Sequence, residues 1–217
     1  MSRQRRGDWT RDELASEFKD MVGRTVPVEI RFEARQKILC FDEVERILCC
    51  SRRIVVDECE CRAKMGRCDR PVDVCLFLDE GADKQIETGT GKEIPLGQAL
   101  AILRKTHELG LVHVALVENG TDPMKYICSC CACCCQAIAA MQRFGYHDSL
   151  VYSNMIASLS HELCDSCGIC EERCNFGALT LEDGKMSFDE PRCFGCGVCT
   201  SSCPIGALTL KPRGTLV

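Results

Sequence analysis

The chain has 217 residues, a formal net charge of −5 and 21 cysteines, which make up nearly a tenth of the sequence. The negative charge argues against nonspecific nucleic-acid binding, and the sequence has no run of about 18 apolar residues that would span a membrane. Residues 1–10 lack the apolar stretch of a secretory signal, and an odd number of cysteines fits poorly with a closed set of disulfides. We therefore expect a cytoplasmic protein, not inserted in a membrane, whose cysteines bind metal.

Hydrophobic spacing predicts helices over residues 11–21, 41–48, 95–109 and 131–144, and strands over 25–32, 53–57 and 111–117. The clearest helix begins at Pro95, which suits a first turn, and ends before Gly110, which suits the position after a helix. Residues 81–91 predict a short helix followed by a loop. Because strands and helices alternate over residues 53–144, we expect a small α/β cysteine-rich domain at residues 1–148. No linker-like composition follows, so a second domain at 149–217 should pack against the first.

The cysteines occur in three groups. Seven lie between residues 40 and 75, six between 128 and 135, and eight between 164 and 203. Residues 1–39 and 76–127 contain none. Cys40, Cys49 and Cys50 lie outside any motif, and we expect them to be ordinary structural residues.

The last group is an internal repeat. The segment from Cys164 to Cys174 reads C-x2-C-x2-C-x3-C, and the same pattern returns 29 residues later from Cys193 to Cys203. The repeat continues through residues 177–181 and 206–210, which are both Gly-Ala-Leu-Thr-Leu. Three thiolates on a tight loop can wrap one side of a cubane cluster, and glycines let backbone amides approach its sulfides. Zinc is the alternative for paired C-x2-C motifs, but eight cysteines in a duplicated pattern favour iron–sulfur clusters.

This arrangement resembles bacterial-type ferredoxins with two 4Fe–4S clusters. The resemblance implies that each motif lends its fourth cysteine to the other cluster. The first ligand set would be Cys164, Cys167, Cys170 and Cys203, and the second Cys193, Cys196, Cys199 and Cys174. It also implies a pseudo-two-fold, ferredoxin-like domain of paired strands and short helices, so that the whole chain would be α+β. Pro204 matches the family pattern after Cys203, whereas Asn175 replaces the proline expected after Cys174.

The two earlier cysteine groups follow a second pattern. It comprises Cys59-Glu-Cys61-Arg62, then Cys68-x2-Pro71-x3-Cys75, then Gly110-Leu-Val-His113, then Cys128-Ser-Cys130-Cys131-Ala-Cys133-Cys134-Cys135. Together with the tail, this pattern resembles a group of anaerobe proteins described as 4Fe–4S ferredoxin-type iron–sulfur-binding proteins, in which asparagine stands in place of Ser129. The resemblance covers about residues 26–217 and implies neither a fold nor a reaction for the N-terminal region.

Six sulfurs within residues 128–135 cannot all point one way on a helix or a strand, so some should face a shared site and others the core. We predict a third metal or iron–sulfur site built from both groups, with ligands among Cys59, Cys61, Cys68, Cys75, Cys128, Cys130, Cys131, Cys133 and Cys134. The alternative is a thiol-rich core, because buried cysteine also packs as a small apolar residue. Arg62 could neutralise cluster charge, contact an anionic partner or form a surface salt bridge. His113 is expected to be a core histidine, with metal ligation as the alternative.

Two clusters in one small domain predict an electron-transfer protein that relays single electrons to or from an anaerobic oxidoreductase. The expected partners are therefore redox proteins, not nucleic acid. One alternative is an iron–sulfur enzyme with an additional cluster or metal site in the N-terminal domain. Another is a redox sensor that uses its thiols or its clusters.

Overall fold

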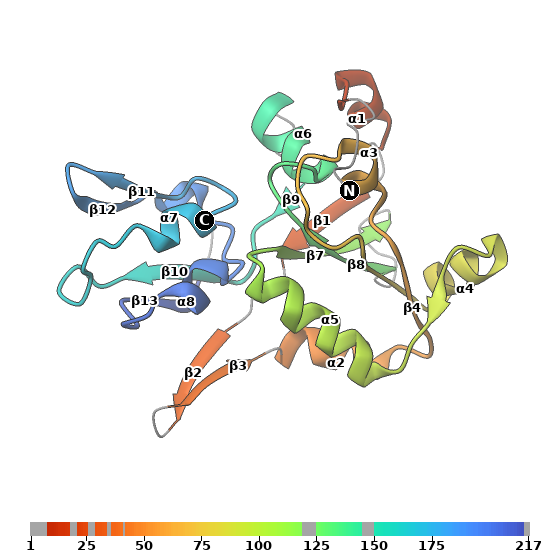
Figure 1. Cartoon of the computed structure of the whole chain (residues 1–217), viewed down its shortest axis with the longest axis horizontal. Coiled ribbons are helices and arrows are strands. Elements are labelled where there is room, and N and C mark those ends of the chain that lie inside the picture. Colours follow the sequence, from red (N-terminus) through yellow and green to blue (C-terminus); the bar gives the residue numbers. More distant parts are fainter. Residues whose placement is uncertain are drawn as a thin grey trace.

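The computed structural model describes residues 8–17, 21–25, 29–33, 36–40, 42–118, 125–144 and 150–214. A larger N-terminal unit is built on a seven-stranded sheet, and a smaller C-terminal unit consists of two-stranded sheets and short helices (Figure 1). Helices and largely antiparallel sheets in these two units make the chain α+β. No helix among the described residues has the length and apolar character needed to cross a membrane.

The N-terminal sheet has the strand order β6-β4-β5-β8-β7-β1-β9. Its strands are β1 (Met21–Thr25), β4 (Ile54–Glu58), β5 (Asp73–Leu78), β6 (Lys92–Glu93), β7 (Val112–Glu118), β8 (Tyr126–Cys130) and β9 (Leu150–Val151). Neighbouring strands are antiparallel except β1 and β9, which are parallel. A separate antiparallel hairpin is formed by β2 (Glu29–Glu33) and β3 (Gln36–Cys40).

Helices cover both faces of this sheet (Figure 1). They are α1 (Arg11–Glu17), α2 (Asp42–Cys50), α3 (Glu60–Met65), α4 (Asp79–Thr88), α5 (Leu96–Glu108) and α6 (Gln136–Phe144). On one face, α2 and α5 bury the main core with Leu76 and Ile127. Because side chains alternate along a strand, Cys75 on β5 and Cys128 and Cys130 on β8 lie on the opposite face, outside that core.

Several predicted elements are confirmed. The helices expected at 41–48 and 95–109 correspond to α2 and α5, and the strands at 53–57 and 111–117 to β4 and β7; Phe41 itself lies outside the described residues. Pro95 precedes the first turn of α5, and Gly110 follows the helix with a φ of 78°. The strand expected at 25–32 corresponds in part to the end of β1 and to β2.

Two predicted helices are too long. In the first, residues 11–17 form α1 and Met21 already belongs to β1; residues 18–20 lie outside the described residues. The second begins only at Gln136, because the N–H groups of Cys134 and Cys135 donate to the Cys131 carbonyl and close a turn after β8. The sequence analysis also missed α3, β5 and β8, the elements that carry Cys61, Cys75, Cys128 and Cys130.

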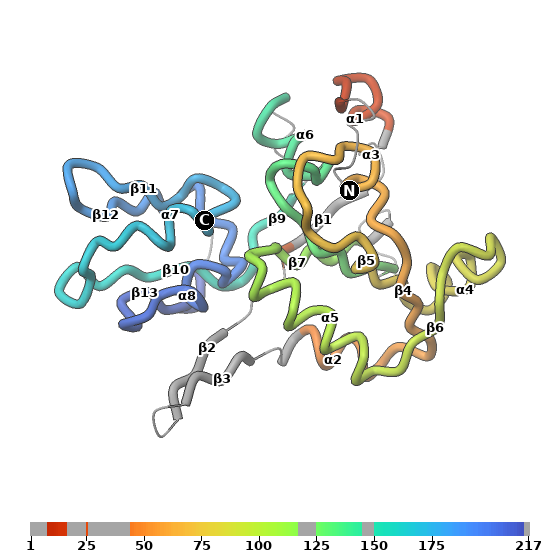
Figure 2. Tube along the Cα trace, in the orientation of Figure 1, coloured from red at the N-terminus to blue at the C-terminus, as the bar shows by residue number. Residues whose placement is uncertain are grey.

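Figure 2 traces the chain as it leaves the N-terminal unit at β9 and enters the C-terminal unit at β10. Here β10 (Met155–Leu159) pairs with β13 (Leu208–Pro212), and β11 (Leu179–Glu182) pairs with β12 (Lys185–Phe188). Two short helices, α7 (Ile169–Arg173) and α8 (Val198–Ser202), lie within the two cysteine motifs. Each follows a glycine with a φ of 78°, Gly168 or Gly197, so the sequence repeat has a matching local backbone.

Candidate functional site

The first cysteine motif and the end of the second line one small cavity. Its cysteines are Cys164, Cys167, Cys170 and Cys203, and most of its other lining side chains are apolar. The Ser166 N–H donates to Cys164 Sγ at 3.4 Å. Burial raises the pKa of Cys170 to about 11. Since Cys203 belongs to the second motif, this cavity draws its cysteines from both copies of the repeat.

A second cavity has the reciprocal composition. It is lined by Cys193, Cys196 and Cys199 of the second motif and by Cys174 of the first. The Ala178 N–H donates to Cys174 Sγ at 3.2 Å. Burial raises the pKa of Cys196 to about 12 and also raises that of Cys199, so thiolates here need the positive charge of a bound metal. Four cysteines, N–H donors to sulfur and apolar walls are a donor set that fits 4Fe–4S ligation.

Residues 163–207 match the family of 4Fe-4S dicluster domains. The C-terminal part of the chain is therefore a ferredoxin-type domain with an iron–sulfur, electron-transfer character. The match spans both cysteine motifs, from Cys164 to Cys203. No curated protein matches the chain.

Asn175 fastens this ferredoxin-type domain to the N-terminal unit. Its Oδ1 accepts a hydrogen bond from the Ala132 N–H at 3.0 Å, and its Nδ2 donates to the Gly110 carbonyl at 3.0 Å. The Asn175 carbonyl in turn accepts from Gln142 Nε2 at 2.7 Å. A proline at this position would have no side-chain amide, so the departure from the ferredoxin pattern has a structural reason in this chain.

An apolar cluster continues across the same interface. Phe176 and Phe194 of the ferredoxin-type domain stack with ring centroids 4.5 Å apart, and they pack in one cluster with Cys130 and Cys135 of the N-terminal unit. Cys174 and Cys196 pack against this cluster. Buried side chains therefore connect the second cysteine cavity directly to the N-terminal cysteines.

Six of the N-terminal cysteines form one connected group. They are Cys59 and Cys61 at the start of α3, Cys75 on β5, Cys128 and Cys130 on β8, and Cys135 just before α6. The register of β5 with β8, Leu76 opposite Ile127, places Cys75 beside Cys128. Hydrogen bonds from Cys61 and Cys75 and the charge of Arg62 lower the pKa of Cys59 to about 2, whereas its bond to Cys59 raises the pKa of Cys61. We call these residues the six-cysteine group.

A cavity of about 320 Å³ opens beside the six-cysteine group. All six cysteines line it, together with Cys134 and with polar side chains that include Glu58, Lys84 and Tyr126. This volume lies at the lower end of the range for small-molecule sites. The arrangement combines a set of thiols with space for a ligand.

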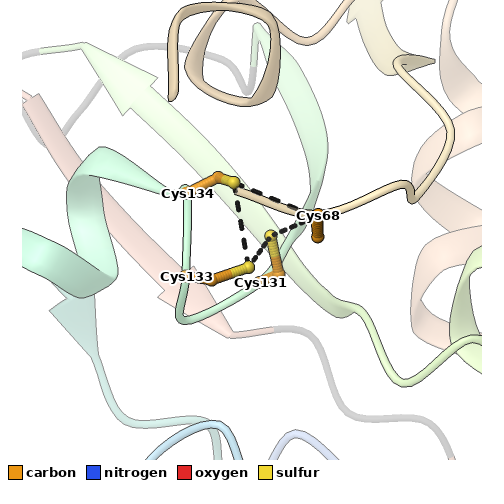
Figure 3. Close-up of side chains that lie close together, drawn as sticks. All are labelled: Cys68, Cys131, Cys133 and Cys134. Atoms are coloured by element: carbon orange, nitrogen blue, oxygen red, sulfur yellow. Dashed lines mark hydrogen bonds between the residues drawn. The ribbon is translucent and has the colours of Figure 1, made fainter. Parts of the chain in front are cut away.

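Four further N-terminal cysteines form a second, compact group: Cys68, Cys131, Cys133 and Cys134. Their sulfur atoms all lie within 4.8 Å of one another (Figure 3). Among them, a hydrogen bond from Cys133 and the charge of Arg62 lower the pKa of Cys131 to about 4. We call these residues the four-cysteine group.

Arg62 lies between the six-cysteine group and the four-cysteine group. It is only 1% exposed, so it does not form a surface salt bridge. Its Nη1 donates to the Pro71 carbonyl at 2.5 Å, and its Nη2 donates to the Ser129 carbonyl at 2.8 Å and approaches Cys131 Sγ at 3.6 Å. Burial lowers the pKa of Arg62, but the neighbouring thiolates of Cys59 and Cys131 outweigh that effect and raise it. A permanently charged guanidinium therefore lies beside the sulfurs of both groups and can balance thiolate charge there.

His113 and Ser129 lie on the face of the sheet that α5 covers. Ser129 Oγ is 3.1 Å from Thr106 Oγ1 and 3.3 Å from His113 Nδ1. Burial, followed by the charge of His107, lowers the pKa of His113 to about 3. A buried, neutral histidine in a side-chain network is what the default interpretation expected.

The nine cysteines predicted as ligands of one third site are thus not brought together at one place. Five of them belong to the six-cysteine group and four to the four-cysteine group. The prediction omitted Cys135, although its position next to Cys134 was visible in the sequence. Cys49 and Cys50 are exposed at the end of α2, away from both groups, and the side chain of Cys40 lies outside the described residues.

Proposed function

We propose that this protein is an iron–sulfur electron carrier or redox subunit with two domains, residues 1–148 and 149–217. The second domain would hold two 4Fe–4S clusters in the bacterial-ferredoxin manner, one in each cysteine cavity. Cys164, Cys167, Cys170 and Cys203 are the proposed ligands of the first, and Cys193, Cys196, Cys199 and Cys174 of the second. The observation that carries this proposal is that each cavity is lined by three cysteines of one motif and one of the other. Bound clusters supply reversible one-electron chemistry.

The two cavities differ in their surroundings, and this supports a direction for the relay. Cys167 of the first cavity is exposed, and Leu163 and Ile205 beside it are 60% and 46% exposed. An exposed apolar rim of this kind suits the transient docking of a redox protein. The second cavity is instead lined by Phe176 and Phe194, which pack in one buried cluster with Cys130 and Cys135 of the N-terminal unit. One electron at a time would enter from a reduced partner at the first cavity, and that partner would be oxidised by one electron.

Hydrogen bonds fix the ferredoxin-type domain against the N-terminal unit, along the proposed route of electron transfer. Asn175 and Arg173 hydrogen-bond to the N-terminal unit, and His107 Nε2 lies 2.7 Å from Ser201 Oγ. The buried apolar cluster that contains Cys130 packs directly against Cys196. Fixed distance and low polarity both favour electron transfer from the ferredoxin-type domain into the N-terminal unit.

Iron analysis and electron paramagnetic resonance on the anaerobically purified full chain test the relay. We expect at least about eight iron atoms per chain, as two four-iron clusters require, and a reduced spectrum of two magnetically interacting clusters. Cys203→Ser should remove the signal of the first cluster, and Cys174→Ser that of the second, while Cys49→Ser should change neither. Fewer than about eight iron atoms in the unmodified protein, or Cys203→Ser and Cys174→Ser spectra that match the unmodified one, would contradict the proposal.

A second candidate function is supported by the cavity beside the six-cysteine group. If those thiols hold a further iron–sulfur centre with an open coordination position, the ferredoxin-type domain would supply electrons to chemistry on a small molecule there. Cyanide is a suitable probe because it binds open iron sites. It should alter a paramagnetic signal that is lost in Cys75→Ala and kept in Cys167→Ser. A spectrum that does not respond to cyanide would favour the simple carrier.

A further inference from the structure

The four-cysteine group has a geometry of its own. Cys68 Sγ lies 4.0 Å from Cys131 Sγ and 3.9 Å from Cys134 Sγ. Cys133 Sγ lies 3.4 Å from Cys131 Sγ and 3.7 Å from Cys134 Sγ. Figure 3 shows the four sulfurs converging from two segments, the loop after α3 and the turn between β8 and α6.

These separations match the ligands of a single tetrahedral ion. Zinc–sulfur bonds of about 2.3 Å at tetrahedral angles place neighbouring sulfurs about 3.8 Å apart. A cubane cluster binds each thiolate through a different iron atom, so its four sulfurs must lie farther apart. The four-cysteine group is therefore too compact for a cubane and has the right size for one metal ion.

We propose that Cys68, Cys131, Cys133 and Cys134 bind one Zn²⁺ ion in a closed, four-thiolate structural site. Cys131 and Cys134 are each 1% exposed, and four protein ligands leave no open position for a substrate. The site is thus distinct in kind from the proposed electron relay, because Zn²⁺ has no redox chemistry.

The surroundings provide the charge balance that such a site needs. A divalent ion with four thiolates carries two net negative charges, and the buried guanidinium of Arg62 approaches Cys131 Sγ at 3.6 Å. Met65 and Leu111, both 0% exposed, pack around the sulfurs with Trp9. A hydrogen-bonded cation and an apolar shell are the outer layer expected of a buried thiolate site.

The ion would join two parts of the chain that are distant in sequence, and a third part packs against them. Cys68 fixes the loop after α3, and the other three ligands fix the turn that separates β8 from α6. Trp9 Nε1 donates to the Cys134 carbonyl at 3.1 Å, so the segment before α1 lies against the same turn. Trp9 is the single tryptophan of the sequence, which makes its fluorescence a direct reporter of this site.

The test uses the full chain, purified anaerobically, with zinc and iron counted together. We expect about one zinc per chain, and zinc-edge X-ray absorption should find four sulfur neighbours at about 2.3 Å. Cys68→Ser should weaken zinc binding by at least about tenfold and leave the iron count unchanged. Cys133→Ser is a second, half-buried variant in case the first does not fold, and Cys49→Ser is the matched control. Co²⁺ exchanged into the site should show tetrahedral thiolate absorption and quench Trp9 fluorescence.

Three results of the zinc measurements would overturn the zinc site. They are a protein without zinc, zinc whose neighbours are not four sulfurs, and a Cys68→Ser variant that keeps its zinc. A loss of about four iron atoms in Cys68→Ser would likewise overturn it, because it would place a cubane there. The electron relay is judged separately, by the spectra of the Cys174 and Cys203 variants.

Discussion

The carbonyl oxygen of Met155 lies 2.0 Å from the point that a Cβ on residue 195 would occupy, so Gly195 allows the second cysteine loop to lie directly on β10. Gly195 also has a φ of +69°, which L-residues with side chains rarely adopt. Ser153 Oγ donates to the Gly195 carbonyl at 3.1 Å and strengthens this contact. This close approach fixes how near the loop that carries Cys193 and Cys196 lies to β10.

Gly195→Ala should therefore destabilise the ferredoxin-type domain by at least about 3 kcal/mol, since the clash is with backbone that cannot move aside. Thermal unfolding and iron content measure the loss. Gly97→Ala is the matched control: it lies in the first turn of α5 with no atom within 4 Å of its Cβ, and it should stabilise the protein by about 0.4–1 kcal/mol. Similar melting temperatures for the two variants would refute the steric argument.

Asn175→Ala removes the side-chain hydrogen bonds to Ala132 and Gly110. We expect a loss of about 1–3 kcal/mol, because the half-buried Ala132 N–H and the Gly110 carbonyl both lose this partner. Hydrogen exchange at Ala132 should accelerate, while iron in the ferredoxin-type domain should stay. Asn154→Ala, at an exposed asparagine of the same domain, should change neither. Unchanged exchange at Ala132 in Asn175→Ala would argue against the interface.

Arg62→Met removes the guanidinium that donates to the carbonyls of Pro71 and Ser129 and leaves the buried thiolates without a counter-charge. Breaking a buried charge pair costs about 3–5 kcal/mol, which corresponds to a fall in Tm of roughly 6–20 °C at this chain length. Arg52→Met is the comparison, because Arg52 is 60% exposed in its pair with Asp83, and solvent screening should make its loss cost much less stability than the loss of Arg62. Equal effects of the two variants would mean that Arg62 does not balance thiolate charge. Calorimetry under anaerobic conditions measures both.

The low pKa of His113 makes stability depend on pH. Its pKa is about 3 in the folded chain against an ordinary value of 6.5, so only the unfolded chain takes up a proton as the pH falls below about 6.5. The contribution of neutral His113 to the free energy of unfolding is complete above pH 6.5 and is lost as the pH falls toward 3. About 2 kcal/mol of it is lost between pH 7 and pH 5. In denaturant titrations, His113→Asn should reduce the dependence of the free energy of unfolding on pH. His161→Asn, at an exposed histidine, should leave that dependence unchanged. If the free energy of unfolding of His113→Asn depends on pH as strongly as that of the unmodified chain, other groups cause the dependence.

The sequence by itself identified the ferredoxin-type domain, because the chemistry of that domain is local. Its motifs place three cysteines within seven residues, and the repeat of both spacing and following strand is visible without any tertiary structure. The helix from Pro95 and the strand after Gly110 were equally readable, since their apolar spacing and end signals agree.

Only the tertiary structure decided how the N-terminal cysteines are divided. Strand alternation turns Cys128 and Cys130 to one side, and the turn that follows β8 brings Cys131 against Cys68, which is 63 residues away in sequence. Neither β5 nor β8 was predicted, so the sheet face that holds Cys75 could not be assigned. The role of Asn175 was hidden for the same reason: its partners, Gly110 and Ala132, lie in another unit and meet it only through long-range packing.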